Sequence, residues 1–257
     1  MSSSITVSTL QVQSGIAQER AAEVISEAPV SLTVNGQTWL TFMCTPTHLD
    51  ALALGFLFNE GVIGSMDDVE DTRVCEHNDN VDIWLKHEAE QPRHWKRTSG
   101  CTGGVSAVDL LPAHPVTAMY TLSVDQVTGL MTHLLESQSL YRLSGGVHTS
   151  ALCDGEKMLI VSEDIGRHNT LDKIAGLCLI KNIWPEQRIL LTTGRISSEM
   201  LQKAARMNVG IVISRTAPSS LSYKMAQKTG ITLIGYARKD RLRVYTHSER
   251  ILVTNRS

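Results

Sequence analysis

Residues 188–214 read RILLTTGRISSEMLQKAARMNVGIVIS, and this stretch indicates the fold class most clearly. An apolar run at 188–193 is followed by a Gly-Arg turn, a pair of serines and a helical stretch at 198–208, and a second apolar run spans 211–214. Neither apolar run has a polar face, which is typical of strands that are covered on both sides. The pattern therefore predicts two buried strands of one sheet, joined by a helix.

The same alternation continues on both sides of this stretch. Further apolar runs at 147–153, 157–162 and 231–237 predict strands, and the segments near 169–181 and 219–229 predict helices. Asp154-Gly155 indicates a hairpin, so part of the sheet is antiparallel. A capping box at Ser123 to Gln126 predicts another helix, which continues to about Ser139. The fold class is α/β, and we expect a three-layer α/β/α sandwich with a mixed sheet over residues 123–257.

The part before the sandwich is expected to be a smaller β-rich domain with one helix, at residues 28–98. Asn35-Gly36, between two runs rich in β-formers, predicts a tight hairpin because both residues tolerate positive φ. Thr47, with Asp50 three residues later, is the expected N-cap of the helix, and Gly61 is its expected end.

The remaining two segments are expected to be irregular. Residues 1–27 are polar and rich in Ser, Gln and Glu, so they are predicted to be a flexible leader, with order beginning near Pro29. Residues 99–122 begin with three glycines around a cysteine and are predicted to be a mobile cysteine loop and connection.

The composition excludes several classes of protein. The 257 residues include 24 Lys and Arg against 26 Asp and Glu, a formal net charge of −2 that disfavours a general nucleic-acid or anionic-membrane binder. No apolar run approaches the roughly 18 residues of a membrane span, and the first residues lack the features of a secretory signal. The five widely spaced cysteines suit a reducing compartment and show no zinc-ligand spacing, so we expect a cytoplasmic protein with no metal site.

Three turns that follow predicted strands carry arginine, hydroxyl groups or both at the start of a helix. Each alone is often a simple helix cap, but on neighbouring strands they would converge on one crevice and offer anion-binding groups to phosphate. The candidate binding residues in these turns are Gly166, Arg167, His168, Gly194, Arg195, Ser197, Ser219 and Ser220.

A fourth candidate segment closes the last long strand and is strongly basic. It is either a solvated hairpin turn or a site that holds a pyrophosphate and stacks a base. The second interpretation follows from four cations, Arg238, Lys239, Arg241 and Arg243, which lie between Tyr236 and Tyr245. Its candidate residues are Tyr236, Ala237, Arg238, Lys239, Asp240 and Arg241.

Cys101 differs from the other cysteines. Cys44, Cys153 and Cys178 sit inside apolar runs and are interpreted as small buried hydrophobes. Cys101 has glycines at 100, 103 and 104 and basic residues just before it, which favour an approachable thiolate. Such a thiol is a candidate nucleophile or sulfur carrier.

Together these motifs resemble the FdhD family, the accessory sulfurtransferases of formate dehydrogenase. The resemblance runs from about Pro29 to Tyr245. The motifs that carry it are Thr98-Ser99-Gly100-Cys101, Ser144-Gly145-Gly146-Val147-His148, the run Glu163–Lys173, Gly194-Arg195 and Ala217-Pro218-Ser219-Ser220.

The resemblance implies a cytidine-deaminase-like sandwich and a homodimer. It implies that Cys101 takes sulfur as a persulfide from a cysteine desulfurase and passes it to the bis-molybdopterin guanine dinucleotide form of the molybdenum cofactor, which is then inserted into formate dehydrogenase. Residues 236–241 match the family's binding stretch for this cofactor, so 123–257 would be a cofactor-binding domain and GDP a fragment ligand. Deaminase activity is not implied, because the zinc-binding motifs of deaminases are absent.

One departure from the family pattern leaves alternatives open. Many members carry a second cysteine three residues after the first, and Gly104 stands there in this chain. Either one cysteine suffices for transfer, or the protein binds and delivers the cofactor without sulfurating it. A nucleotide or phosphate-ester hydrolase with His168 as general base is a third interpretation.

Overall fold

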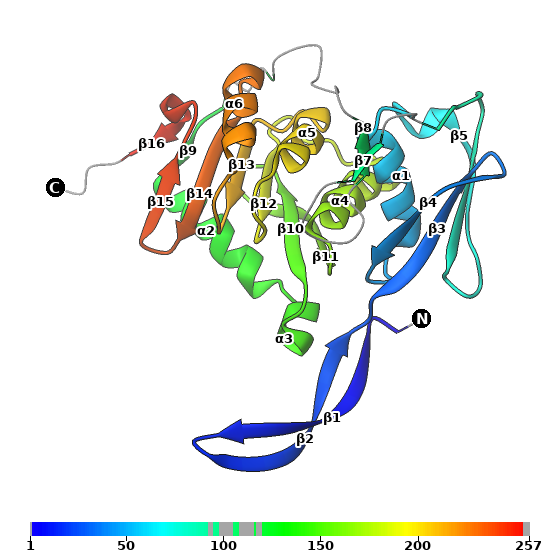
Figure 1. Cartoon of the computed structure of the whole chain (residues 1–257). Coiled ribbons are helices and arrows are strands. Elements are labelled where there is room, and N and C mark those ends of the chain that lie inside the picture. Colours follow the sequence, from blue (N-terminus) through cyan, green and yellow to red (C-terminus); the bar gives the residue numbers. More distant parts are fainter. Residues whose placement is uncertain (1, 92–94, 98–104, 108–115, 117–119, 254–257) are drawn as a thin grey trace.

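The structure is a computed structural model that describes residues 2–91, 95–97, 105–107, 116 and 120–253 (Figure 1). Its largest element is a six-stranded sheet in the order β11-β10-β12-β13-β14-β15. The strands are β10 (His148–Cys153), β11 (Met158–Asp164), β12 (Ile189–Thr192), β13 (Ile211–Ser214), β14 (Thr232–Arg238) and β15 (Arg241–Val244). The three central strands β12, β13 and β14 are parallel, and the pairs on either side are antiparallel, so the predicted mixed sheet is confirmed.

Helices cover both faces of this sheet, which fits a central strand with three successive buried apolar residues at Ile189, Leu190 and Leu191. Leu190 packs against the helices of one face, whereas Ile189 and Leu191 pack against the helix on the other. The first face carries α4 (Arg167–Lys181), α5 (Ser198–Arg206) and α6 (Ser220–Thr229), and the second carries α2 (Val124–Glu136), which is followed by the short α3 (Leu140–Ser144). The predicted α/β sandwich of three layers is therefore present, and the capping box at Ser123 forms as expected.

The β-rich part forms a four-stranded sheet in the order β4-β3-β6-β5, with one helix. Its elements are β3 (Ala28–Val34), β4 (Gln37–Cys44), α1 (Leu49–Asn59), the 3-10 turn η1 (Met66–Asp68), β5 (Val69–Val74) and β6 (Asn80–Leu85). Asn35 and Gly36 have φ of 48° and 78°, so the predicted hairpin turn is correct. The predicted N-cap is wrong: His48, in the left-handed region, precedes α1, and the Thr47 hydroxyl instead accepts a hydrogen bond from Lys173.

The β-rich part and the sandwich share one apolar core through the crossing of α1 and α4. A Cβ on Gly55 would lie 1.7 Å from the carbonyl oxygen of Asp172, and a Cβ on Gly176 would lie 1.9 Å from that of Ala51. The two backbones therefore touch, and the buried residues of both parts belong to one cluster.

The expectation of a flexible leader at residues 1–27 is wrong. β1 (Ser4–Gln13) and β2 (Ile16–Ile25) pair over their whole length in an antiparallel hairpin, which we call the arm. Ser14 and Gly15, with φ of 52° and 81°, make its turn. The composition of these strands is polar because almost none of their side chains is buried, and a polar composition does not predict strands.

The remaining short strands flank the segment that contains Cys101. β7 (Trp95–Arg97) and β8 (Val105–Ala107) pair antiparallel, while β9 (Leu122–Ser123) pairs with β16 (Ile251–Leu252), which follows the 3-10 turn η2 (Ser248–Arg250). Most of the predicted cysteine loop and connection at 99–122, including Cys101 itself, lies outside the described residues.

Candidate functional site: the carboxyl edge of the central sheet

The predicted turns lie side by side at one edge of the sheet, where the parallel strands end. The Arg215 amide donates to the Thr192 carbonyl (3.1 Å), and the Tyr236 amide donates to the Thr216 carbonyl (3.0 Å). These bonds join the ends of β12, β13 and β14 in order. The expected convergence of the turns is therefore present.

A cleft of about 540 Å³ opens at this edge, between the sheet and the α2–α3 corner. It is lined by Leu135, Gln138, Tyr141, Gly145, Gly146, Val147, His148, Ile165, Thr193 and Arg215. None of the residues predicted for binding is among them. Instead, the cleft is lined by residues next to them in the sequence. Ile165 precedes Gly166, Thr193 precedes Gly194, and Arg215 directly follows β13.

Gly194 holds two of the predicted turns together. A Cβ at this position would lie 3.1 Å from the Cβ of Arg167 and 3.5 Å from Nδ1 of His148. The Ser214 hydroxyl donates to the Gly194 carbonyl (2.7 Å), which fixes the turn against β13. Any larger residue would push Arg167 or His148, so glycine is required for this close approach.

The cleft side of this contact is electropositive. Burial lowers the pKa of His148, and the charges of Arg167 and Arg195 lower it further, while Asp164 acts in the opposite direction. His148 is therefore a neutral donor or acceptor at neutral pH, and the positive charge comes from the arginines. Arginines beside a cleft are suited to phosphate recognition.

His168 lies on the other side of the sheet edge and is neutral. Burial lowers its pKa to about 3, and the charges of Lys203 and Arg167 act in the same direction. Its Nε2 lies 3.2 Å from both the Ser197 hydroxyl and a Glu199 carboxylate oxygen. A general base is most effective when its pKa lies near the working pH, so a His168 pKa of about 3 does not support the hydrolase interpretation.

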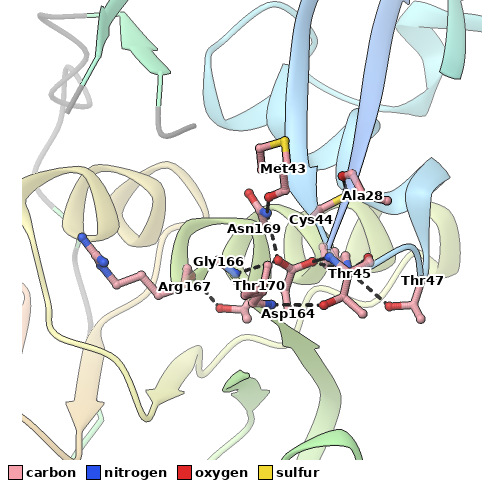
Figure 2. A network of polar contacts seen from close by, with 12 residues as sticks. Ala28, Met43, Cys44, Thr45, Thr47, Asp164, Gly166, Arg167, Asn169 and Thr170 are labelled. Atoms are coloured by element: carbon pink, nitrogen blue, oxygen red, sulfur yellow. Dashed lines mark hydrogen bonds and ion pairs between the residues drawn. The ribbon is translucent and has the colours of Figure 1, made fainter. Parts of the chain in front are cut away.

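Behind the edge, a network of buried charged and polar groups connects α4 to the β-rich part. Figure 2 shows its contacts around Asp164 and Thr45. The Lys173 ammonium and the Asp164 carboxylate are both fully buried, 2.6 Å apart. Lys173 also donates to the Thr45 carbonyl (2.9 Å), and the Thr45 amide donates to Asp164 (3.1 Å). The second carboxylate oxygen of Asp164 accepts from the Gly166 amide (2.8 Å), so the network fixes the turn that carries Arg167.

A second carboxylate positions the wall of the cleft. Glu163, at the end of β11, accepts hydrogen bonds from the backbone amides of Ser139, Leu140 and Tyr141 at 2.8 to 3.0 Å. These bonds cap α3. The partial burial of Glu163 acts to raise its pKa, but a hydrogen bond from the Ser139 hydroxyl and the three backbone bonds outweigh this and lower the pKa. Tyr141, on α3, is thereby held at the cleft.

The basic segment at 236–241 forms a hairpin next to the third turn. Tyr236 has φ of 52°, and the guanidinium of Arg243 lies 5.0 Å from its ring centre. Ala237 is buried, whereas the side chains of Arg238, Lys239, Asp240 and Arg241 are exposed. The hairpin therefore offers its charges to solvent beside the sheet edge, outside the cleft lining.

The serine turns have local roles that the sequence anticipated. Ser197 and Ser219 are N-caps whose hydroxyls accept from the amides of Met200 and Ser222. Ser220 begins α6 and is exposed, as is Arg195. The structure thus accounts for Ser197 and Ser219 as helix caps, and leaves Arg195 at the surface.

Three of the described cysteines are buried, as predicted. Burial raises the pKa of Cys44, Cys153 and Cys178 to about 12, which makes them unreactive near neutral pH. Within the described ranges, no cluster of His, Cys, Asp and Glu could hold a metal ion. None of the described helices is long and apolar enough to cross a membrane.

Residues 25–252 match the model of the FdhD/NarQ family. The chain belongs to this family. The Bacillus pumilus protein "Sulfur carrier protein FdhD" is 39% identical over 236 residues, which cover 89% of this chain and 90% of the relative. The Bacillus subtilis protein of the same name is 37% identical over 235 residues, with the same coverage. The family predicted from the motifs is confirmed.

A solved structure supports the fold. The crystal structure of a Desulfotalea psychrophila protein, provisionally described as a formate dehydrogenase accessory protein, superposes with a TM-score of 0.81 at 28% identity. The superposition covers 98% of this chain and 100% of that one. The two proteins therefore share this fold over almost the whole of both chains.

Sequence reasoning missed the cleft residues His148, Thr193 and Arg215 as site residues. The family motifs include His148 without a role, and the predicted turns include neither Thr193 nor Arg215. The arginine at the end of β13 was the available signal, because ligands bind beyond the carboxyl ends of such strands.

Proposed function

We propose that the protein is a sulfur carrier that serves the maturation of a formate dehydrogenase. Cys101 accepts sulfane sulfur from a cysteine desulfurase as a persulfide and transfers it to the bis-molybdopterin guanine dinucleotide molybdenum cofactor. The observation that supports this most strongly is the match, over nine-tenths of both chains, to relatives named sulfur carrier proteins. In this role the protein is a cytoplasmic sulfurtransferase that acts as a homodimer.

The cofactor is the substrate, and the sheet edge is the surface proposed to bind it. Its nucleotide diphosphates carry negative charge, and Arg215 at the cleft, Arg195 nearby and the arginines of the hairpin at 236–241 offer bidentate donors to phosphate. Tyr236 offers an aromatic ring for a guanine base. In this proposal the predicted residues at 166–168 and 194–197 hold the turns of the sheet edge in place. They do so through the close approach at Gly194 and through the buried network behind the edge.

The transfer step requires little from the protein except access and a good leaving group. An electron pair from the reduced metal centre of the substrate is donated to the terminal sulfur of the persulfide, the sulfur–sulfur bond breaks with its electron pair on the Cys101 sulfur, and Cys101 leaves as a thiolate. The transferred sulfur is thereby reduced to a sulfide ligand, and the metal centre of the substrate is oxidised by two electrons. Basic residues before Cys101 in the sequence favour that thiolate.

A non-catalytic cofactor chaperone is the second candidate. It is favoured by one observation, that Gly104 replaces the second cysteine found in many family members. In that case the sheet edge binds the cofactor and Cys101 has no role in transfer.

The carrier and the chaperone can be distinguished by formate dehydrogenase activity, measured in cells that lack their own FdhD-type protein and produce this chain instead. Cys101→Ser should abolish the activity, while the matched control Cys75→Ser, in a partly exposed turn of the β-rich part, should retain it. Full activity with Cys101→Ser would reject the carrier in favour of the chaperone.

A further inference from the structure

The arm formed by β1 and β2 extends away from both larger sheets, as Figure 1 shows in blue. Among the described strands, none other than β1 and β2 pairs with either of them. A hairpin of two strands is at best marginally stable alone in water. A contact beyond the one that β2 makes with α3 would therefore stabilise the arm.

The tip of the arm exposes three large apolar side chains to solvent. Leu10 is 65% exposed, Val12 63% and Ile16 66%, which are the largest exposures of big apolar side chains in the described chain apart from Val253. Leu10 and Val12 lie on one face of the arm, together with Ala17, Glu19 and Ala21 of β2. Such a grouping is typical of an interaction surface.

The two outer edges of the arm differ in charge. β2 carries Glu19, Arg20 and Glu23, and charged side chains on an edge discourage pairing with another strand. β1 reads SITVSTLQVQ and has no charged residue and no proline. Its free edge is therefore an open template for strand addition, whereas that of β2 is protected.

We propose that β1 pairs antiparallel with β1 of a second copy of this chain, to give a four-stranded sheet in the order β2-β1-β1-β2. This inference rests on the homodimer proposed above and names its interface. A two-fold axis requires one residue of β1 to face its own counterpart, and the centre of the strand places Ser8 or Thr9 there. Both residues are small and neutral, so neither opposes its copy.

The same pairing places the tip of one arm beside the base of the other. Strands of this length extend about 33 Å, and antiparallel pairing along the whole strand brings Leu10 and Val12 to the partner's body. At the base of the arm, Ile25 of β2 lies against Gly146, and a Cβ on that glycine would be 3.1 Å from its Cγ2.

The surface that would receive the tip is also apolar and exposed. On α3, which contacts β2, Tyr141 is 45% exposed and Leu143 is 56% exposed. Tyr141 and Gly146 both line the cleft at the sheet edge. The dimer would therefore cover the exposed apolar residues and complete the outer wall of the cleft of each copy.

Light scattering on the full chain with two charge variants tests the interface. Ser8→Lys places two lysines against each other across the axis, and Ala21→Lys is the matched control, because Ala21 is directly opposite Ser8 on the same face but on the protected strand. We expect a mass near twice 28.2 kDa for the unmodified chain and for Ala21→Lys. Ser8→Lys should weaken the dimer by about tenfold or more, with unchanged circular dichroism.

Disulfide trapping tests the register. In a background with Cys75→Ser and Cys101→Ser, either Ser8→Cys or Thr9→Cys should form a disulfide-linked dimer on mild oxidation, and Ala21→Cys should not. A dimer that persists in Ser8→Lys and forms no bond in either β1 variant would overturn this interface while leaving the proposed homodimer standing. An unmodified chain that is monomeric at all concentrations would overturn both.

Discussion

The Lys173 ammonium lies 2.6 Å from the Asp164 carboxylate, and both side chains are completely buried between α4 and the β-rich part. Asp164 ends β11 and Lys173 lies two turns into α4, so the pair spans the turn that carries Gly166 and Arg167. Lys173 donates a hydrogen bond to the Thr45 carbonyl, and Asp164 accepts one from the Thr45 amide, so this turn is connected to residues far away in the sequence. The candidate site therefore depends on the joint between the two parts of the molecule.

Breaking this pair should strongly destabilise the protein. Lys173→Met leaves the Asp164 carboxylate buried without its cation, and the free energy of unfolding should fall by about 3–5 kcal/mol in urea titrations. The control is Arg73→Met, which removes the exposed partner of Asp71 and should cost less than about 1 kcal/mol. Equal effects of the two substitutions would contradict the role assigned to the buried pair.

The contact of α1 with α4 leads to a second prediction. Gly176→Ala would place a Cβ 1.9 Å from the Ala51 carbonyl oxygen, so the helices must separate and the melting temperature should fall by several degrees. Gly129→Ala in α2, where a Cβ meets nothing within 4 Å, should leave it unchanged or raise it. A stable Gly176→Ala variant would show that the crossing is looser than described.

The stability of the protein should depend on pH through His168. Its folded pKa of about 3 lies below the usual 6.5, so below pH 6.5 the unfolded chain binds more protons than the folded one. The free energy of unfolding should therefore fall as the pH drops from about 6.5 toward 3, by up to about 1.4 kcal/mol per unit. His168→Gln should reduce the loss between pH 7 and pH 5 by about 2 kcal/mol, whereas His133→Gln, at an exposed position of α2, should not change it. Identical pH profiles for all three proteins would exclude a neutral buried His168.

Binding of GDP tests the sheet edge as the nucleotide surface. Calorimetry should detect GDP binding that is tighter than ADP binding, and Arg238→Ala or Arg241→Ala should weaken it by about 1.5–3 kcal/mol if each makes a charge-assisted bond. Arg215→Ala tests the cleft in the same way, and Arg73→Ala, on the β-rich part, is the control. Equal affinity for GDP and ADP, or no loss in any of the three variants, would argue against this surface.

The sequence predicted the elements whose signals are local. The hairpin turn at Asn35-Gly36, the capping box at Ser123 and the buried strands around 188–214 all follow from neighbouring residues, and all are correct. The arm was missed because its strands bury almost nothing, so hydrophobic periodicity gives no signal. The pairing of Asp164 with Lys173 and Thr45 was missed because it depends on contacts between distant segments.

The candidate site was predicted in part for the same reason. The Gly-Arg turns were found because each follows a strand, and the structure places them together at one edge. The cleft itself has walls from α3, the start of β10 and the end of β13, and no single motif contains all three. Tyr141 reaches it because Glu163 fixes α3 against the sheet, and Gln138 reaches it because its side-chain amide donates to the Thr149 hydroxyl.

The proposed role of Cys101 as a carrier of sulfane sulfur is tested by mass spectrometry of the purified protein after incubation with a cysteine desulfurase and cysteine. We expect an added mass of about 32 Da, one sulfur atom, on the Cys101 peptide, which disappears with reductant. Because no second cysteine stands at position 104, no neighbouring thiol in that motif can displace the sulfur, so the adduct should be long-lived. Peptides containing Cys44, Cys153 and Cys178, whose thiols have a pKa of about 12, should remain unmodified. An unmodified Cys101, or the same adduct in protein carrying Cys101→Ser, would contradict the sulfur-carrier function.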